Sequence, residues 1–360
     1  MAHAIALAAR GLGRTHPNPP VGAVVVRRGK IVGEGFHRRA GGPHAEIVAL
    51  RAAGRRAVGA TLYLTLEPCT HFGRTPPCLG RVLASGVTRV VIGMRDPNRR
   101  VRGRGVAGLR RAGVAVTVGT LAAECAAVSA GYLSWIRRGR PLVVLKLAAS
   151  LDGRIATAAG AARWITGTAA RRGVHALRNR LDAVMVGAGT IRTDDPQLTC
   201  RLRGGRDPIR VVVAGRLRLS PRARVFRSGS RVPTWIVAAR DAPRRREAAL
   251  SRAGGEVVRL PGRGRVALAS VLRELGRRGV TSVLVEGGTT LAGALIRAGL
   301  VDRLVLYLAP ILLGADGIPV VGPLGVREPA RALRLRGLRV ASVGQDLVVE
   351  ATLPLSRVAL

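Results

Sequence analysis

One short stretch, residues 43–78, constrains this chain more than any other. It reads Pro43-His44-Ala45-Glu46 and, further on, Glu67-Pro68-Cys69, with a second cysteine at Cys78. One imidazole and two thiolates are what a catalytic zinc takes as its three protein ligands, while a water fills the fourth tetrahedral position. His44, Cys69 and Cys78 therefore predict one open zinc site per chain.

Glu46 follows the predicted histidine ligand by two residues. At the start of a helix its carboxylate can face a metal-bound water, so we expect Glu46 to act as the proton shuttle. A lone histidine or cysteine is more often a structural residue. His-Ala-Glu followed by Pro-Cys and a second cysteine is, however, the pattern of the zinc-dependent nucleobase deaminases.

The spacing of the two cysteines narrows this interpretation. Eight residues, 70–77, separate them in place of the two found in the cytidine and adenosine deaminases. The longer spacing resembles the deaminase half of the bifunctional riboflavin-biosynthesis deaminase/reductase family. The resemblance implies a cytidine-deaminase-like α/β/α domain and a phosphorylated pyrimidine substrate. Family positions that line the pyrimidine and its phosphate fall here on Asn18, His37, His71 and Arg74.

Apolar patterning and breakers predict an alternating α/β unit in the first half. We expect helices at 5–12, 44–53, 77–85, 105–112 and 120–138, and strands at 21–26, 31–35, 61–65, 89–93 and 114–118. Two of the predicted metal ligands then lie at helix starts, where the positive end of the dipole favours thiolate. The run Arg137-Arg138-Gly139-Arg140-Pro141 breaks the last helix and marks the predicted domain boundary.

The second half restarts with an apolar strand at 141–148, and further strands are expected at 183–187, 209–214, 234–238, 280–286 and 303–309. Gly287 and Gly288 lie between a predicted strand and a predicted helix. Bare N–H groups there can hold a pyrophosphate, but glycine pairs after strands are often simple turns, so both interpretations stay open. Lys146 lies within the first strand, where an unpaired ammonium is costly; it is either a functional contact or a solvated edge residue.

Four segments of this half, 145–153, 164–166, 189–196 and 285–288, follow the order and approximate spacing of the reductase half of the same family. The resemblance implies two α/β domains, a zinc-dependent pyrimidine deaminase over 1–140 and a dihydrofolate-reductase-like NADPH reductase over 141–360. It places along the cofactor Ala148, Trp164, Thr190, Asp194, Gly287, Gly288, Thr289, Thr290, Leu291, Ala292 and Gly293. It places along the reductase substrate Lys146, Ala162, Arg178, Leu198, Arg201 and Glu286.

At three of these positions the resemblance leaves the role of the residue open. Ala162 falls where the family often has a substrate-contacting serine, which removes one hydrogen bond. Arg178 and Arg201 suit a phosphate because the planar guanidinium donates two hydrogen bonds at once. Each can instead be one more surface arginine in an arginine-rich chain.

The net charge of +40 is the outlying feature of the composition. It favours a nucleic-acid partner, but arginine is scattered through almost every segment and the chain has only two lysines. We therefore expect non-specific attraction to polyanions and no specific nucleic acid. Two alternatives remain: a tRNA or nucleotide deaminase with an appended basic RNA-binding domain, and a non-catalytic nucleic-acid-binding protein. Nicotinamide binding separates both from the reductase interpretation.

The compartment follows from the remaining composition. The sequence has neither a long uninterrupted apolar run nor a basic segment before its apolar start, so we expect no membrane span and no signal peptide. Four cysteines, two of them assigned to zinc, do not form a disulfide framework, which favours the cytoplasm. A homo-oligomer is compatible with the sequence, which does not fix the oligomeric state.

Overall fold

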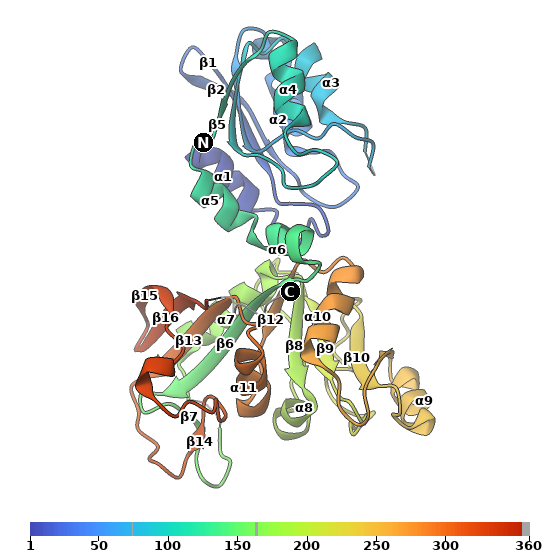
Figure 1. The fold of residues 1–360 in the computed structure, drawn as a ribbon, viewed down its shortest axis with the longest axis vertical. Helices are drawn as coiled ribbons and strands as arrows, with labels where there is room; N and C mark the ends of the chain where they lie inside the picture. Colours follow the sequence, from blue (N-terminus) through green and yellow to red (C-terminus); the bar gives the residue numbers. More distant parts are fainter. Residues whose placement is uncertain (74, 163–164, 355–360) are drawn as a thin grey trace. The chain divides into compact units, whose positions relative to one another are not determined.

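A computed structural model describes residues 1–73, 75–162 and 165–354 (Figure 1). The chain divides into two compact units. Unit 1 comprises Met1–Arg140 and Gly279–Thr281, and unit 2 comprises Pro141–Arg278 and Ser282–Leu360. Each unit is built around a sheet of its own.

The sheet of unit 1 has five strands in the order β2-β1-β3-β4-β5. They are β1 (Gly22–Arg27), β2 (Lys30–Phe36), β3 (Thr61–Leu66), β4 (Arg89–Met94) and β5 (Ala115–Val118). The two-residue loop between β1 and β2 has positive φ at both Arg28 (50°) and Gly29 (75°), the geometry that lets a tight antiparallel hairpin follow the strand twist. From β3 to β5 the strands are parallel, so their carboxyl ends meet at one edge.

The helices of unit 1 are α1 (Ala2–Ala9), α2 (Ala45–Ala53), α3 (Cys78–Ala84), α4 (Arg104–Arg111), α5 (Ala122–Val128) and α6 (Ala130–Arg138), with a 3-10 turn, η1 (Gly54–Ala57). Helix α2 lies directly on β2, because a Cβ at Gly33 would come within 2.4 Å of the Ala49 carbonyl oxygen. This close approach fixes the helix start that carries His44 and Glu46. The single helix predicted over 120–138 is wrong: Ser129, at φ −96° and ψ 11°, lies outside the helical region and separates α5 from α6.

The sheet of unit 2 has nine strands in the order β11-β10-β9-β8-β12-β6-β13-β16-β15. Their bounds are β6 (Leu142–Ser150), β8 (Ala183–Gly187), β9 (Ile209–Val213), β10 (Thr234–Ala239), β11 (Gly255–Leu260), β12 (Ser282–Val285), β13 (Arg303–Ala309), β15 (Arg336–Val343) and β16 (Asp346–Thr352). The strands from β11 to β13 run parallel, and β13, β16 and β15 are antiparallel. Every residue of β10 and β12 is buried, as expected for strands covered on both faces. A small second sheet pairs β7 (Arg154–Ala156) with β14 (Ile318–Pro319).

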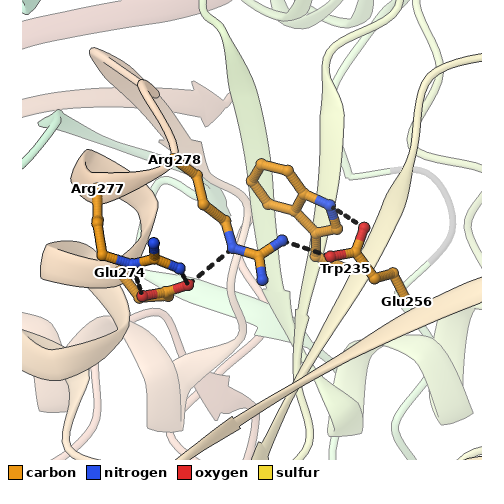
Figure 2. A network of polar contacts seen from close by, with 5 residues as sticks. All are labelled: Trp235, Glu256, Glu274, Arg277 and Arg278. Carbon is orange, nitrogen blue, oxygen red and sulfur yellow. Dashed lines mark hydrogen bonds and ion pairs between the residues drawn. The ribbon is translucent and has the colours of Figure 1, made fainter.

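The helices of unit 2 are α7 (Thr168–Arg180), α8 (Ala188–Asp194), α9 (Arg244–Arg252), α10 (Leu268–Arg277) and α11 (Thr289–Arg297), with a 3-10 turn, η2 (Pro329–Arg331). A polar network ties the end of α10 to β10 and β11 (Figure 2). The Arg278 guanidinium lies over the Trp235 ring at 4.8 Å and pairs with Glu256 and Glu274. Every helix among the described residues is too short or too polar to cross a membrane.

Candidate active sites

Three elements of unit 1 bring the predicted zinc ligands together. His44 is the N-cap of α2, Cys78 is the first residue of α3, and Cys69 lies in the loop after β3. Their ligand atoms all lie within 4.8 Å of one another. His44 Nδ1 is 3.1 Å from Cys78 Sγ and 3.6 Å from Cys69 Sγ. Tetrahedral zinc with ordinary bond lengths needs a nitrogen-to-sulfur separation of about 3.5 Å, so the donor set fits the ion.

The protonation states of the two sulfurs also suit a metal. The Cys78 thiol donates toward Cys69 Sγ, and this hydrogen bond is the main cause that lowers the pKa of Cys69 to about 4. Cys69 is therefore a thiolate, the form that binds zinc. The pKa of Cys78 is raised, because it holds the shared proton and is buried. Binding of a metal would release that proton.

Glu46 lies in the first turn of α2 and is buried. Burial raises the pKa of its carboxyl, against the opposing effect of His44. A carboxyl with a raised pKa exchanges a proton near neutral pH more readily than an exposed one does. The structure thus places a candidate proton carrier two residues from one ligand and, by its side-chain hydrogen bond, next to Cys78.

In unit 2, a buried ion pair joins two predicted substrate residues that are far apart in sequence. Arg178, in the last turn of α7, donates from Nε to Glu286 Oε1 at 2.6 Å and from Nη2 to Oε2 at 2.8 Å. Its Nη1 donates to the Thr199 carbonyl oxygen at 2.8 Å. The sequence predicted that the paired N–H donors of Arg178 bind a phosphate. In this structure Glu286 accepts those hydrogen bonds, so the paired donors do not face a ligand.

Lys146 lies beside this pair, because β6 and β12 are parallel neighbours in which Leu145 pairs with Val285. Burial lowers the pKa of its ammonium, and Glu286 opposes that shift. The edge position considered for Lys146 is wrong, since β6 lies between β12 and β13 in the sheet. Lys146, Glu286 and Arg178 thus form one charged cluster at the sheet.

The structure confirms the predicted order of a strand, a glycine pair and a helix around residues 282–297. Glu286 follows β12, Gly288 is the N-cap of α11, and the helix begins at Thr289. A Cβ at Gly288 would lie 4.0 Å from Thr190 Oγ1 on α8, so two predicted cofactor positions from separate helices lie close together. Ala148 is on β6, and Asp194 is the last residue of α8.

Comparison with known proteins covers both units. Residues 1–94 match the family described as the cytidine and deoxycytidylate deaminase zinc-binding region, and residues 141–349 match the RibD C-terminal domain. The chain is 43% identical over 364 residues to the riboflavin biosynthesis protein RibD of Escherichia coli, covering 96% of each chain, and 40% identical to that of Aquifex aeolicus, covering 96% of this chain and 95% of that one. The chain belongs to the RibD family.

Solved structures agree over the full length. RibD of Acinetobacter baumannii superimposes with a TM-score of 0.88 at 38% identity, covering 98% of this chain and 97% of that one. A diaminohydroxyphosphoribosylaminopyrimidine deaminase/5-amino-6-(5-phosphoribosylamino)uracil reductase from Thermotoga maritima gives a TM-score of 0.87 at 37% identity with the same coverage. The expected fold is confirmed: a cytidine-deaminase-like unit and a RibD reductase unit, both α/β. This RibD-family chain is a bifunctional deaminase and reductase of riboflavin biosynthesis, with a zinc-binding deaminase unit and an NADPH-dependent reductase unit.

The predicted pyrimidine-lining residues of this RibD-family chain divide into two groups. Asn18 Nδ2 donates to His37 Nε2 at 3.1 Å, and His37 Nδ1 donates to the Pro43 carbonyl oxygen at 3.0 Å. Burial lowers the pKa of His37, which keeps the ring neutral beside the His44 ring, 5.1 Å away between centroids. His71 lies separately, partly exposed in the loop after Cys69. Arg74 lies outside the described residues.

The remaining residues predicted to line the reductase site do not form one cluster among the described residues. Leu198 is buried with φ 57°, and Arg201 donates its backbone N–H to His175 Nδ1 at 3.2 Å. Ala162 is exposed near the end of a loop, and Trp164 lies outside the described residues. His175, which no sequence pattern singles out, accepts this bond from Arg201 and lies on α7, the helix that carries Arg178.

Glu67 is a buried residue of the deaminase unit that sequence reasoning missed. Its carboxylate accepts backbone N–H groups from Asp96 at 3.1 Å, Gly103 at 3.0 Å and Val106 at 3.0 Å. These bonds join the start of the Cys69 loop to the start of α4. An acidic residue directly before Pro-Cys, after an apolar strand, was the available signal, because a charge seldom follows a buried strand without a partner.

Proposed function

We propose that unit 1 hydrolytically removes an amino group from 2,5-diamino-6-(5-phosphoribosylamino)pyrimidin-4(3H)-one. Unit 2 then reduces the ribosyl group with NADPH to give 5-amino-6-(5-phosphoribitylamino)uracil. The main support for this proposal is that His44, Cys69 and Cys78 lie close together and that the buried Glu46 lies beside them. The related Thermotoga protein, named as both a deaminase and a reductase, supports the pairing of the two reactions in one chain.

In the deaminase step, His44, Cys69 and Cys78 would hold zinc, which supplies a Lewis acid able to lower the pKa of a coordinated water. Glu46 takes one proton from the attacking water and passes it to the ring nitrogen. It then takes the remaining hydroxyl proton of that water and delivers it to the amino group, so that the C–N bond breaks, the carbonyl forms and ammonia leaves. Its raised pKa suits this exchange, because a shuttle must both accept and release a proton at working pH. Asn18 and His37 orient the pyrimidine from the side next to His44.

In the reductase step, NADPH supplies the hydride and the protein supplies binding and orientation. The segment from Gly287 to Gly293, with Ala148, Thr190 and Asp194, would line the cofactor. Lys146 and Glu286 face the ribosyl group, and Arg178 holds the Glu286 carboxylate in place. Arg201, which is exposed, is then the better candidate for the substrate phosphate.

We further propose that the partners are small molecules and a second copy of the chain. Arginine is spread through both units, which favours non-specific polyanion attraction over specific nucleic-acid recognition. The outermost strand β15 exposes Leu338 by 60% and Val340 by 56%, a surface that a homo-oligomer would cover. The cysteine usage favours work in the cytoplasm, where thiols stay reduced.

One assay of the purified full-length protein tests this function. The diaminopyrimidine substrate should yield ammonia without NADPH, and NADPH should then be oxidised by the deaminated product. A deaminase of tRNA would instead release ammonia from RNA and leave NADPH untouched. Ammonia release from RNA alone would refute the proposal.

A further inference from the structure

The eight residues between the two cysteines, 70–77, are longer than a zinc loop needs, and one of them reaches a zinc ligand. Thr75 Oγ1 lies 3.2 Å from His44 Nε2, on the side of the ring opposite the two sulfurs. We propose that Thr75 is a positioning residue for the metal centre. It accepts a hydrogen bond from His44 Nε2–H and so presents Nδ1 to the metal.

The chemistry of the ring requires an acceptor at that place. A neutral imidazole carries one proton, and Nδ1, which faces both sulfurs, can bind a metal only with its lone pair free. The proton must then lie on Nε2, where Thr75 Oγ1 accepts it. Histidine ligands of metals nearly always donate their second N–H in this way, which fixes the tautomer and the ring orientation.

The backbone of the segment links this hydroxyl to a ligand. Thr75 is followed by Pro76 and Pro77, whose rings fix φ, and then by Cys78 at the start of α3. The Gly73 N–H donates to the Thr75 carbonyl oxygen at 3.2 Å, a further contact within this segment. One short, stiff stretch therefore supplies both a thiolate and the acceptor for the histidine. With only two residues between the cysteines, the segment could not also supply this acceptor. The proposed role of Thr75 therefore accounts for the eight residues that separate Cys69 from Cys78.

The inference rests on the proposed zinc site, so the test measures zinc affinity of the full-length protein by competition with a coloured chelator. Thr75→Val keeps the shape and removes the hydroxyl, and its zinc dissociation constant should rise by about 10-fold or more. Thr75→Ser keeps the hydroxyl and should stay within about 2-fold of the parent. Thr70→Val is the matched control: it removes a hydroxyl of the same segment that bonds the Arg100 carbonyl oxygen at 3.3 Å instead of His44.

The outcomes separate the possibilities. Parent-like zinc affinity in Thr75→Val, or an equal loss in Thr75→Ser or Thr70→Val, overturns the inference. An unchanged zinc affinity with a raised Michaelis constant for deamination would mark Thr75 as a substrate contact instead. Thr75→Ala replaces the valine variant if that protein fails to fold, as judged by its reductase rate and thermal midpoint. Cys69→Ser runs alongside, because full zinc retention there refutes the ligand set itself.

Discussion

Replacing Arg178 by Met should destabilise unit 2 strongly, because it leaves Glu286 charged and buried. The two side chains are only 10% and 13% exposed, and two short hydrogen bonds join them. Burial disfavours the charged form of both side chains. The attraction and hydrogen bonds between them outweigh burial, so the pKa of Glu286 is lowered and that of Arg178 is raised. Removing one partner of such a pair costs about 3–5 kcal/mol. Nearby Lys146 compensates in part, which favours the lower end.

Urea unfolding with tryptophan fluorescence measures this cost. In a Trp135→Phe background the remaining tryptophans, Trp164 and Trp235, both belong to unit 2. With a slope of roughly 2 kcal/mol per molar urea, the midpoint should fall by about 1.5 M or more. The control is Arg180→Met, an exposed arginine of the same helix, which should change stability by less than about 0.5 kcal/mol.

A double-variant cycle completes the test. Arg178→Met with Glu286→Leu removes both charges and should recover most of the lost stability, because a well-packed apolar pair replaces a buried ion pair at little cost. An Arg178→Met protein that loses no more stability than Arg180→Met would refute the buried-pair explanation. In that case a raised Michaelis constant for the reductase substrate would return Arg178 to phosphate binding.

Three further outcomes are expected. Glu67→Gln takes an acceptor from buried N–H groups, so thermal unfolding should show unit 1 destabilised by about 1–3 kcal/mol while NADPH oxidation stays near the parent rate. Burial lowers the pKa of Lys146, so its charge is present at lower pH and lost as pH rises. The reductase rate should therefore drop with rising pH at a pH below about 10.4, the ordinary lysine pKa, and the pH profile of Lys146→Met should lack that drop. RNA binding should weaken steeply with salt and show no sequence preference, whereas preference for one sequence in a filter titration would support the deaminase-on-RNA alternative.

The residues that could be predicted from sequence are those whose side-chain chemistry is rare. His44, Cys69 and Cys78 need only residue type and short spacing, and the helix starts at His44 and Cys78 follow from local patterning. Thr75 was not predictable, because hydroxyls are common and its contact depends on how residues 70–77 turn. The family resemblance placed Arg178 and Glu286 along one substrate but offered no sign that they pair with each other, since 108 residues separate them and Arg178, on α7, meets the end of β12 only in the folded unit.

The sequence also predicted some elements of the fold better than others. Strands β8 and β13 are apolar runs that sequence patterning places to the residue. Strands β15 and β16 were missed, because β15 is exposed almost throughout and carries arginines where a covered strand carries aliphatic residues. The break at Ser129 was missed as well, since serine is compatible with a helix interior and alanines lie on both sides of it.

Two separate sites are expected to perform the two reactions, and Glu46→Gln tests this separation most directly. This substitution keeps the size of the side chain and removes its proton-carrying group. Ammonia release should fall by about 100-fold or more, the usual scale for losing general acid–base help. The same protein, given the already deaminated substrate, should oxidise NADPH at near the parent rate. Loss of NADPH oxidation in a folded Glu46→Gln protein would contradict the account.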